Sequence, residues 1–106
     1  MDMESICFQI ITSVGSAKSC FIEAIGYAKK GEFDEARKQI TEGDQFFLEG
    51  HHAHADLIAQ EAGGEPVQMS LILTHAEDQL MSAETARIYA LEFIELYEKL
   101  SAKGLL

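Results

Sequence analysis

Apolar residues recur at intervals of three and four along nearly the whole chain of 106 residues, and two glycine-containing stretches break this pattern. Such spacing places the apolar side chains on one face of an α-helix. It predicts three helices, at about residues 4–30, 33–62 and 66–102, separated by Gly31 and by Gly63-Gly64. No alternating β-strand pattern continues for more than a few residues. The sequence therefore predicts an all-α protein with one domain over residues 1–106.

The short breaks between the predicted helices favour an up-down-up antiparallel bundle of three helices. The third segment is apolar over more than half of its circumference, so it needs cover on several sides. Two partner helices leave part of it bare, and we therefore expect the protein to associate with copies of itself. The aromatic residues Phe46, Phe47, Phe93 and Tyr97 are most simply assigned to the core.

Acidic residues outnumber basic residues by 18 to 8, which gives a formal net charge of −10. This charge repels the phosphates of nucleic acids, and no basic stripe offsets it, so nucleic acid is not an expected partner. The N-terminus lacks the positive charge of a signal peptide, and Glu23, His75 and Glu92 interrupt the longest apolar stretches. We therefore expect a cytoplasmic protein without a membrane-spanning helix, in which Cys7 and Cys20 are reduced thiols.

The residue with the most informative surroundings is His75, inside the third predicted helix. Asp78 and Gln79 follow it by three and four residues, so both lie beside it, one turn further on. An aspartate next to an imidazole can hold one ring nitrogen as a hydrogen-bond donor and leave the other free as a nucleophile or a ligand. By spacing alone, an ordinary structural pair is the simpler interpretation, because a histidine followed by an aspartate at this distance is common.

The string SLILTHAEDQLM, from Ser70 to Met81, resembles the signature of the lactose/cellobiose family of enzyme IIA in the sugar phosphotransferase system. In that family a histidine within a helix is followed by an aspartate three residues later and then by Leu-Met. The similarity extends over almost the whole chain with its spacing preserved. It also includes Phe8–Ile11, Gly15, Ala17, Lys18, Ser19, Ala28–Phe33, Glu49–His51, Glu61–Glu65 and Ile94–Tyr97.

The resemblance implies a phosphotransferase component that folds as a three-helix bundle and assembles as a homotrimer. It implies that His75 accepts a phosphoryl group from phospho-HPr and passes it to a cysteine of the cognate enzyme IIB during uptake of a β-disaccharide. The link to the membrane component, enzyme IIC, would be indirect. The lactose, cellobiose and chitobiose branches share these motifs, so the sugar is not specified by them.

The resemblance also implies roles for the two neighbours of His75. Asp78 matches an aspartate that points to the trimer axis, where three copies bind one divalent cation per trimer, usually Mg²⁺. Gln79 stands where the family commonly has a second histidine. A glutamine cannot carry phosphate, but it can donate a hydrogen bond to it. His75 is therefore expected to be the sole carrier.

Two other functions fit parts of the sequence. A histidine-containing phosphotransfer module of two-component signalling also carries phosphate on a helical histidine, but it usually has four helices and a small residue in place of Gln79. A helical assembly or metal-binding adaptor would use the cluster His51, His52 and His54, in which members at helical spacing can bind a transition metal. A closed metal site needs further ligands, so solvated or core-lining histidines are the simpler interpretation of this cluster.

Overall fold

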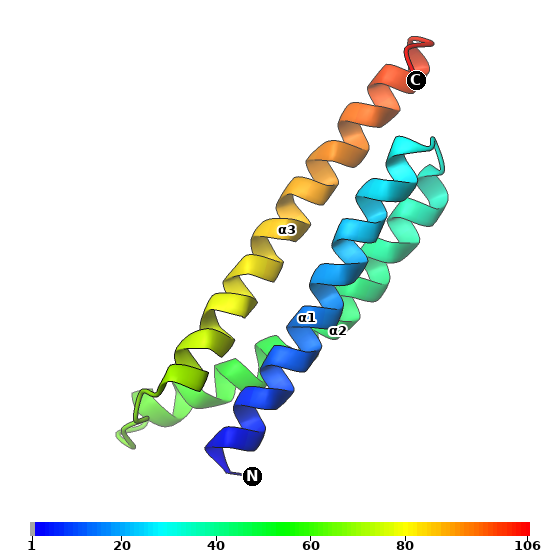
Figure 1. Ribbon diagram of the computed structural model, residues 1–106. Helices are drawn as coiled ribbons and strands as arrows, with labels where there is room; N and C mark the ends of the chain where they lie inside the picture. Colours follow the sequence, from blue (N-terminus) through cyan, green and yellow to red (C-terminus); the bar gives the residue numbers. More distant parts are fainter. Residues whose placement is uncertain (1) are drawn as a thin grey trace.

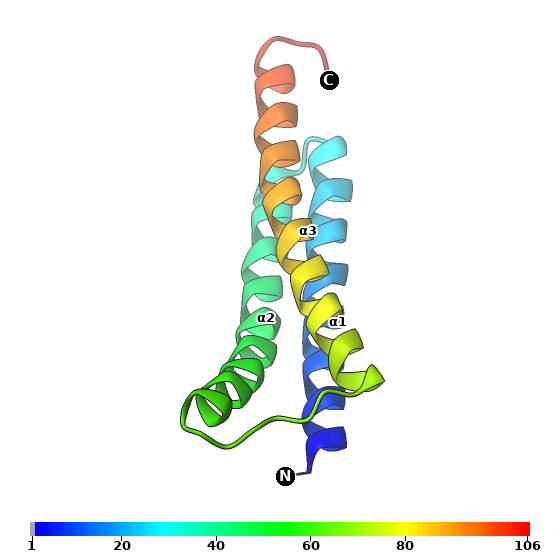
Figure 2. The same cartoon turned by 90° about the vertical axis from the view of Figure 1, so that its left-hand side faces the viewer.

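The computed structural model describes residues 2–106 and contains three α-helices among them: α1 (Met3–Lys29), α2 (Phe33–Ala62) and α3 (Leu71–Ala102). α1 and α3 run in the same direction and α2 runs the opposite way, in an elongated bundle of 57 × 20 × 19 Å (Figures 1 and 2). α1 packs along both other helices, whereas α2 and α3 contact each other much less. The predicted all-α class and the up-down-up order are confirmed.

The second residue of each of the two connections is a glycine whose backbone is left-handed. Gly31 has a φ of 77°, and the amide of Glu32 donates a hydrogen bond to the carbonyl of Tyr27 at 3.0 Å. Gly64 has a φ of 94°, and the amide of Glu65 donates to the carbonyl of Gln60 at 3.1 Å. Both arrangements satisfy carbonyls that a helix end leaves without partners, and glycine adopts this backbone without the penalty of a Cβ atom. The two predicted breaks are confirmed.

The prediction that the third helix begins near Pro66 is wrong, because α3 begins at Leu71. The Ser70 side chain accepts a hydrogen bond from the amide of Leu73 at 3.2 Å and so caps the first turn. The C-terminal end of α2 diverges from α1, so the chain needs a non-helical segment to return to α3 (Figure 2). Residues 65–70 form that segment, and Pro66 disfavours helical backbone at the residue before it.

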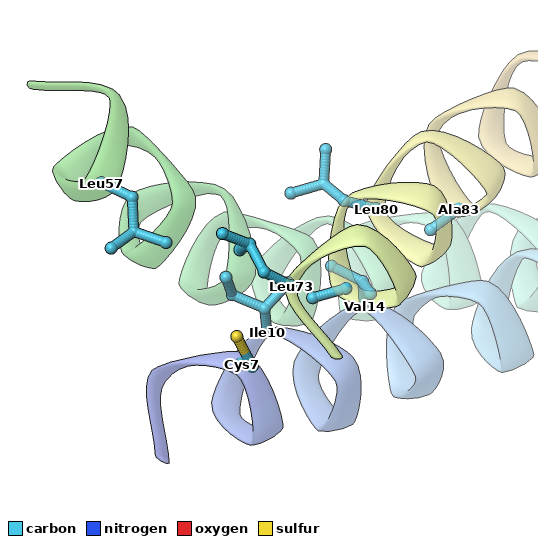
Figure 3. Packing of buried hydrophobic residues seen from close by; sticks show 8 residues of the cluster. Cys7, Ile10, Val14, Leu57, Leu73, Leu80 and Ala83 are labelled. Atoms are coloured by element: carbon cyan, nitrogen blue, oxygen red, sulfur yellow. The ribbon is translucent and has the colours of Figure 1, made fainter. Parts of the chain in front are cut away.

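Two apolar clusters, one toward each end of α1, hold the bundle together. In the first, Cys7, Ile10 and Val14 of α1 lie against Leu73 and Leu80 of α3 (Figure 3). Full burial of one large apolar side chain contributes about 1.5–3 kcal/mol. The second cluster surrounds the fully buried ring of Phe21 and is rich in alanine: Ala17, Ala24, Ala28, Ala36, Ile40, Ala90 and Ile94.

Two glycines inside α2 allow it to approach α1 closely. A methyl group placed at Gly50 would lie 2.6 Å from Val14 Cγ1, and one placed at Gly43 would overlap the ring of Phe21. Glycine is unfavourable in a helix interior by about 1 kcal/mol relative to alanine. The closeness of the two helices explains why α2 nevertheless contains glycine at these positions.

The expectation that all four paired aromatics belong to the core is wrong for two of them. Phe46 and Phe93 are exposed, whereas Phe47 and Tyr97 pack against the apolar clusters. Neighbouring residues of an α-helix point about 100° apart, so Phe46 and Phe47 cannot both face the core. The same geometry separates Phe93 from the buried Ile94.

By length and composition, α1 is long and apolar enough to span a membrane. This differs from the expectation, drawn from the charged and polar residues within the apolar stretches, that the chain has no such helix. In the bundle, most of its apolar residues pack against α2 and α3, as those of a core helix do. Cys7 and Cys20 of this helix are both buried and free, as expected.

Candidate functional site

His75 lies in the second turn of α3 and is exposed to solvent. It is closer to the helix N-terminus than the sequence suggested, because α3 starts later than predicted. The next residue, Ala76, is fully buried and fixes this turn against the bundle core. The imidazole therefore projects from a firmly packed backbone into a position that a partner protein can reach.

Asp78 and Gln79 lie on opposite sides of His75. At about 100° per residue, Asp78 is about 60° round the helix in one direction and Gln79 is about 40° round in the other. Asp78 is exposed, whereas Gln79 is half-buried and lines a groove between α1 and α3. Within residues 2–106, no side-chain hydrogen bond joins His75 to either of them. The suggested His75–Asp78 pair is therefore not formed in the single chain.

The groove beside Gln79 contains one cation. Lys18 of α1 donates a hydrogen bond from Nζ to Ser82 Oγ of α3 at 2.9 Å, and the pair is partly buried. Gly15 and Ser19 of α1 also line this groove. Sequence reasoning assigned no role to Lys18 or Ser82. The available signal was that Lys18 is the only basic residue before Lys29.

On the other flank of α3, a histidine–carboxylate pair joins α2 to α3. His54 Nε2 lies 3.0 Å from Glu77 Oε1, and both side chains line a cavity of about 110 Å³ together with Leu57 and Leu73. Burial, and secondarily the charge of Glu77, raise the pKa of the nearby Cys7 thiol above its ordinary value. Glu77 thus belongs to the interior flank of α3, away from the exposed His75.

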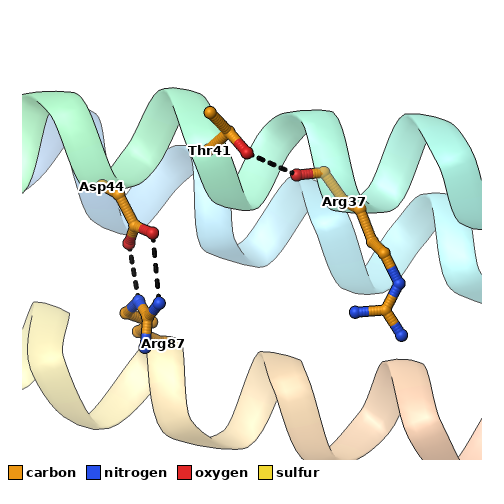
Figure 4. Close-up of polar contacts among 4 residues, drawn as sticks. All are labelled: Arg37, Thr41, Asp44 and Arg87. Atoms are coloured by element: carbon orange, nitrogen blue, oxygen red, sulfur yellow. Dashed lines mark hydrogen bonds and ion pairs between the residues drawn. The ribbon is translucent and has the colours of Figure 1, made fainter.

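An arginine–aspartate pair holds the middle of α2 beside α3 (Figure 4). Arg87 donates from Nε to Asp44 Oδ1 at 2.6 Å and from a terminal nitrogen to Oδ2 at 3.1 Å. The hydrogen bonds to Asp44 raise the pKa of the Arg87 guanidinium above its ordinary value. Both side chains are about two-fifths exposed, so the pair contributes no more than about 1 kcal/mol. Its two-point geometry fixes how α2 and α3 lie relative to each other.

The histidines of the α2 cluster point to three different surroundings. His51 lies beside Phe47, with the ring centroids 6.0 Å apart, and His52 is exposed on another face. His54 is engaged with Glu77. In the part of the chain that the structure describes, no three histidine, cysteine or carboxylate side chains gather as a possible metal site. The metal-binding adaptor therefore lacks a ligand set in the single chain.

The bare apolar face predicted for the third helix is confirmed. Asp78 lies on this face, opposite the buried side of α3, and Leu71 at its start is 88% exposed. The other large exposed side chains of α3 are Met81, Ile88, Tyr89, Phe93 and Leu96. A face with this many large exposed apolar side chains, and with Asp78 near one end, is unusual for a surface that faces only water.

Comparison with known proteins places this arrangement among characterised relatives. The family model of the lactose/cellobiose-specific IIA subunit of the phosphotransferase system matches residues 5–98. The lichenan-specific phosphotransferase enzyme IIA component of Bacillus subtilis (strain 168) is 45% identical over 100 residues, which cover 94% of this chain and 91% of that protein. The N,N'-diacetylchitobiose-specific EIIA component of Escherichia coli (strain K12) is 35% identical over 101 residues, covering 95% and 87%.

Solved structures agree with the sequence comparison. The crystal structure of the cellobiose-specific enzyme IIA from Bacillus anthracis has a TM-score of 0.93 and 43% sequence identity, covering 98% of this chain and 96% of that one. The solution structure of the IIA(chitobiose)–HPr complex from Escherichia coli has a TM-score of 0.82 and 33% identity, covering 95% and 98%. The chain therefore belongs to the lactose/cellobiose-specific IIA family, the phosphocarrier components of the sugar phosphotransferase system.

Proposed function

We propose that this protein accepts a phosphoryl group from phospho-HPr on His75 and donates it to a cysteine of its cognate enzyme IIB during uptake of a β-disaccharide. The observation that carries the proposal is His75 itself, an exposed imidazole on a packed turn of α3. The similarity to an enzyme IIA solved in complex with HPr supports HPr as the donor. The protein would act in the cytoplasm and reach the membrane enzyme IIC only through enzyme IIB.

Both transfers are displacements at phosphorus. In the first, a neutral ring nitrogen of His75 forms a bond to phosphorus while the phosphorus–nitrogen bond of phospho-HPr breaks. In the second, the cysteine thiolate of enzyme IIB forms a bond to phosphorus while the bond to His75 breaks. Such reactions need chiefly correct positioning and stabilisation of the negative charge on the phosphoryl oxygens. Exposure of His75 suits a group that two different partners must reach in turn.

Gln79 is the neighbour suited to contact the phosphoryl group. Its amide has two N–H donors and lies one turn from His75, on the side that faces α1. A phosphoryl oxygen on His75 can accept one of these donors. Because an amide cannot be phosphorylated, Gln79 orients the group without competing for it, and His75 remains the sole carrier.

We further propose that two other copies of the chain cover the bare face of α3, giving a homotrimer that binds one divalent cation, Mg²⁺, at its axis. The residues fit such an ion, because Mg²⁺ prefers carboxylate oxygens and the Asp78 carboxylate is exposed on this face. One chain offers no set of three ligands in residues 2–106, so the site requires Asp78 from each copy. The cation would supply positive charge among carboxylates that otherwise repel one another.

The test is intact-mass spectrometry after incubation with phosphoenolpyruvate, enzyme I and HPr. We expect one phosphate per chain in the wild type and none in His75→Ala. His52→Ala is the matched control, because His52 is also exposed and lies on α2, and this variant should accept phosphate normally. Phosphate on His75→Ala, or none on the wild type, would contradict the proposal.

A further inference from the structure

We propose that Lys18 binds the phosphoryl group carried by His75, and that Ser82 holds the lysine ready while the histidine is unphosphorylated. This inference rests on the function proposed above. It concerns a side chain of α1, whereas the proposed carrier and Gln79 both belong to α3. It arises from three observations: the distribution of charge along the chain, the groove between α1 and α3, and the hydrogen bond from Lys18 to Ser82.

The charge distribution leaves Lys18 as the only nearby source of positive charge within the chain. Lys18 is the only lysine or arginine in residues 1–28 and 39–86, which include the half of the bundle that contains His75. Those segments contain three and nine acidic residues respectively. Phosphorylation adds roughly two further negative charges at this end of the molecule. A phosphoryl group on His75 therefore enters surroundings that repel it, and Lys18 is the basic side chain of these segments that can offset this repulsion.

The groove brings the lysine to the correct side of α3. Ser82, the partner of Lys18, follows His75 by seven residues, so it lies two turns along, about 10 Å, on nearly the same side of the helix. Gln79 lies between them and lines the same groove as Lys18. Gly15 lies one turn before Lys18 on α1, and a Cβ atom there would have no neighbour within 4 Å, so the groove is open at this point.

The hydrogen bond to Ser82 is one that a phosphoryl group can replace. A serine hydroxyl is a neutral acceptor, and hydrogen bonds from an ammonium group to an anionic oxygen are about twice as strong as those between neutral groups. The ammonium group has three donors on a flexible stem, and the bond to Ser82 uses only one. We infer that the ammonium group moves from Ser82 towards His75 when the phosphoryl group arrives and contacts its oxygens beside Gln79. Only hydrogen bonds change in this step.

The phosphoryl-exchange equilibrium between HPr and this protein tests the inference. Lys18→Met keeps most of the length of the side chain and removes its charge, and we expect the equilibrium to shift towards phospho-HPr by roughly threefold to tenfold. Lys38→Met is the matched control, because it removes the same charge from an exposed position at the other end of the bundle. It should leave the equilibrium unchanged. Lys18→Arg, which keeps the charge, should shift it less than Lys18→Met.

Ser82→Ala separates phosphoryl binding from a simple link between helices. If Lys18 and Ser82 only join α1 to α3, both Lys18→Met and Ser82→Ala lower the melting temperature and change the equilibrium equally. If Lys18 binds the phosphoryl group, Ser82→Ala leaves the equilibrium intact or favours the phosphorylated protein. In addition, ³¹P NMR should show a higher pKa for the second ionisation of the phosphoryl group in Lys18→Met than in the wild type.

The outcomes also separate this inference from the proposed function. A wild type that takes no phosphate from phospho-HPr would contradict the function itself. The role of Lys18 alone would be contradicted by a different result. In that case the wild type is phosphorylated on His75, but Lys18→Met and Lys38→Met give the same phosphoryl-exchange equilibrium and the same ³¹P titration. Circular dichroism on each variant establishes that the helices are intact.

Discussion

Burial determines which single residues of this protein can react. The Cys7 side chain is fully buried and Cys20 is 9% exposed, and burial raises the pKa of both thiols above the ordinary value. Thiolates, not thiols, are the reactive species, so both cysteines should be protected twice, by lack of access and by protonation. His75 is the opposite case, since it is exposed to solvent.

We predict that iodoacetamide modifies the folded protein at pH 8 at least about tenfold more slowly than the same protein in urea. Mass spectrometry over time measures this, and Cys20 should react before Cys7 because it is the less buried thiol. Because their pKa values are raised on folding, these thiols contribute stability below the ordinary thiol pKa, and this stability declines as pH rises above it. Alkylation of the folded protein at the rate of free thiols would contradict the prediction.

Sequence spacing could identify His75 as a candidate but not the contacts around it. Asp78 is at a helical distance that permits a pair, yet the two side chains diverge round the helix and remain unbonded. Lys18 and Ser82 are 64 residues apart in the chain, and Glu77 and His54 are 23 apart. Pairs of this kind depend on how helices are placed against each other, which periodicity within one helix does not specify.

At the scale of a helix, α2 contains glycine only where α1 approaches it. We predict that Gly50→Ala lowers the free energy of unfolding by about 1–3 kcal/mol, because the added methyl group overlaps Val14. Gly26→Ala is the matched control in α1, where an added Cβ atom has no neighbour within 4 Å. It should raise the free energy of unfolding by about 0.5–1 kcal/mol through helix propensity. Urea denaturation measures both, and equal effects would show that close packing is not the reason for Gly50.

The extents of the helices were largely predictable, and the exception has a physical cause. The boundaries of α1 and α2 follow from apolar periodicity and from glycines at their ends. Residues 66–70 carry acceptable helix signals, with Pro66 at a favourable early position, yet they are not helical. The divergence of α2 from α1 requires a longer connection, and Ser70 supplies a cap for a later start. Tertiary geometry, not local propensity, determines this boundary.

For the whole molecule, the bare face of α3 predicts self-association. We expect the wild type to sediment as a species of three times the chain mass of 11.7 kDa. Ile88→Asp places a charge on this face and should shift the protein towards monomer. Ile22→Asp is the matched control, because Ile22 of α1 is exposed to the same degree, 53% against 52% for Ile88. Sedimentation velocity measures the outcome, and a monomeric wild type, or equal effects of the two substitutions, would contradict the proposed trimer.

The proposed cation makes the stability of the trimer depend on Asp78. Three carboxylates gathered at one axis repel, and a divalent cation between them offsets this repulsion, so a chelator should lower the melting temperature of the wild-type trimer. Asp78→Asn removes the repulsion together with the need for the ion. Its melting temperature should therefore respond little to chelator or to added Mg²⁺. Asp56→Asn, the same chemical change at an exposed position of α2, should keep the wild-type response. If chelator changes the melting temperature of Asp78→Asn and of the wild type equally, Asp78 does not bind the cation. The proposed trimer is tested separately, by sedimentation.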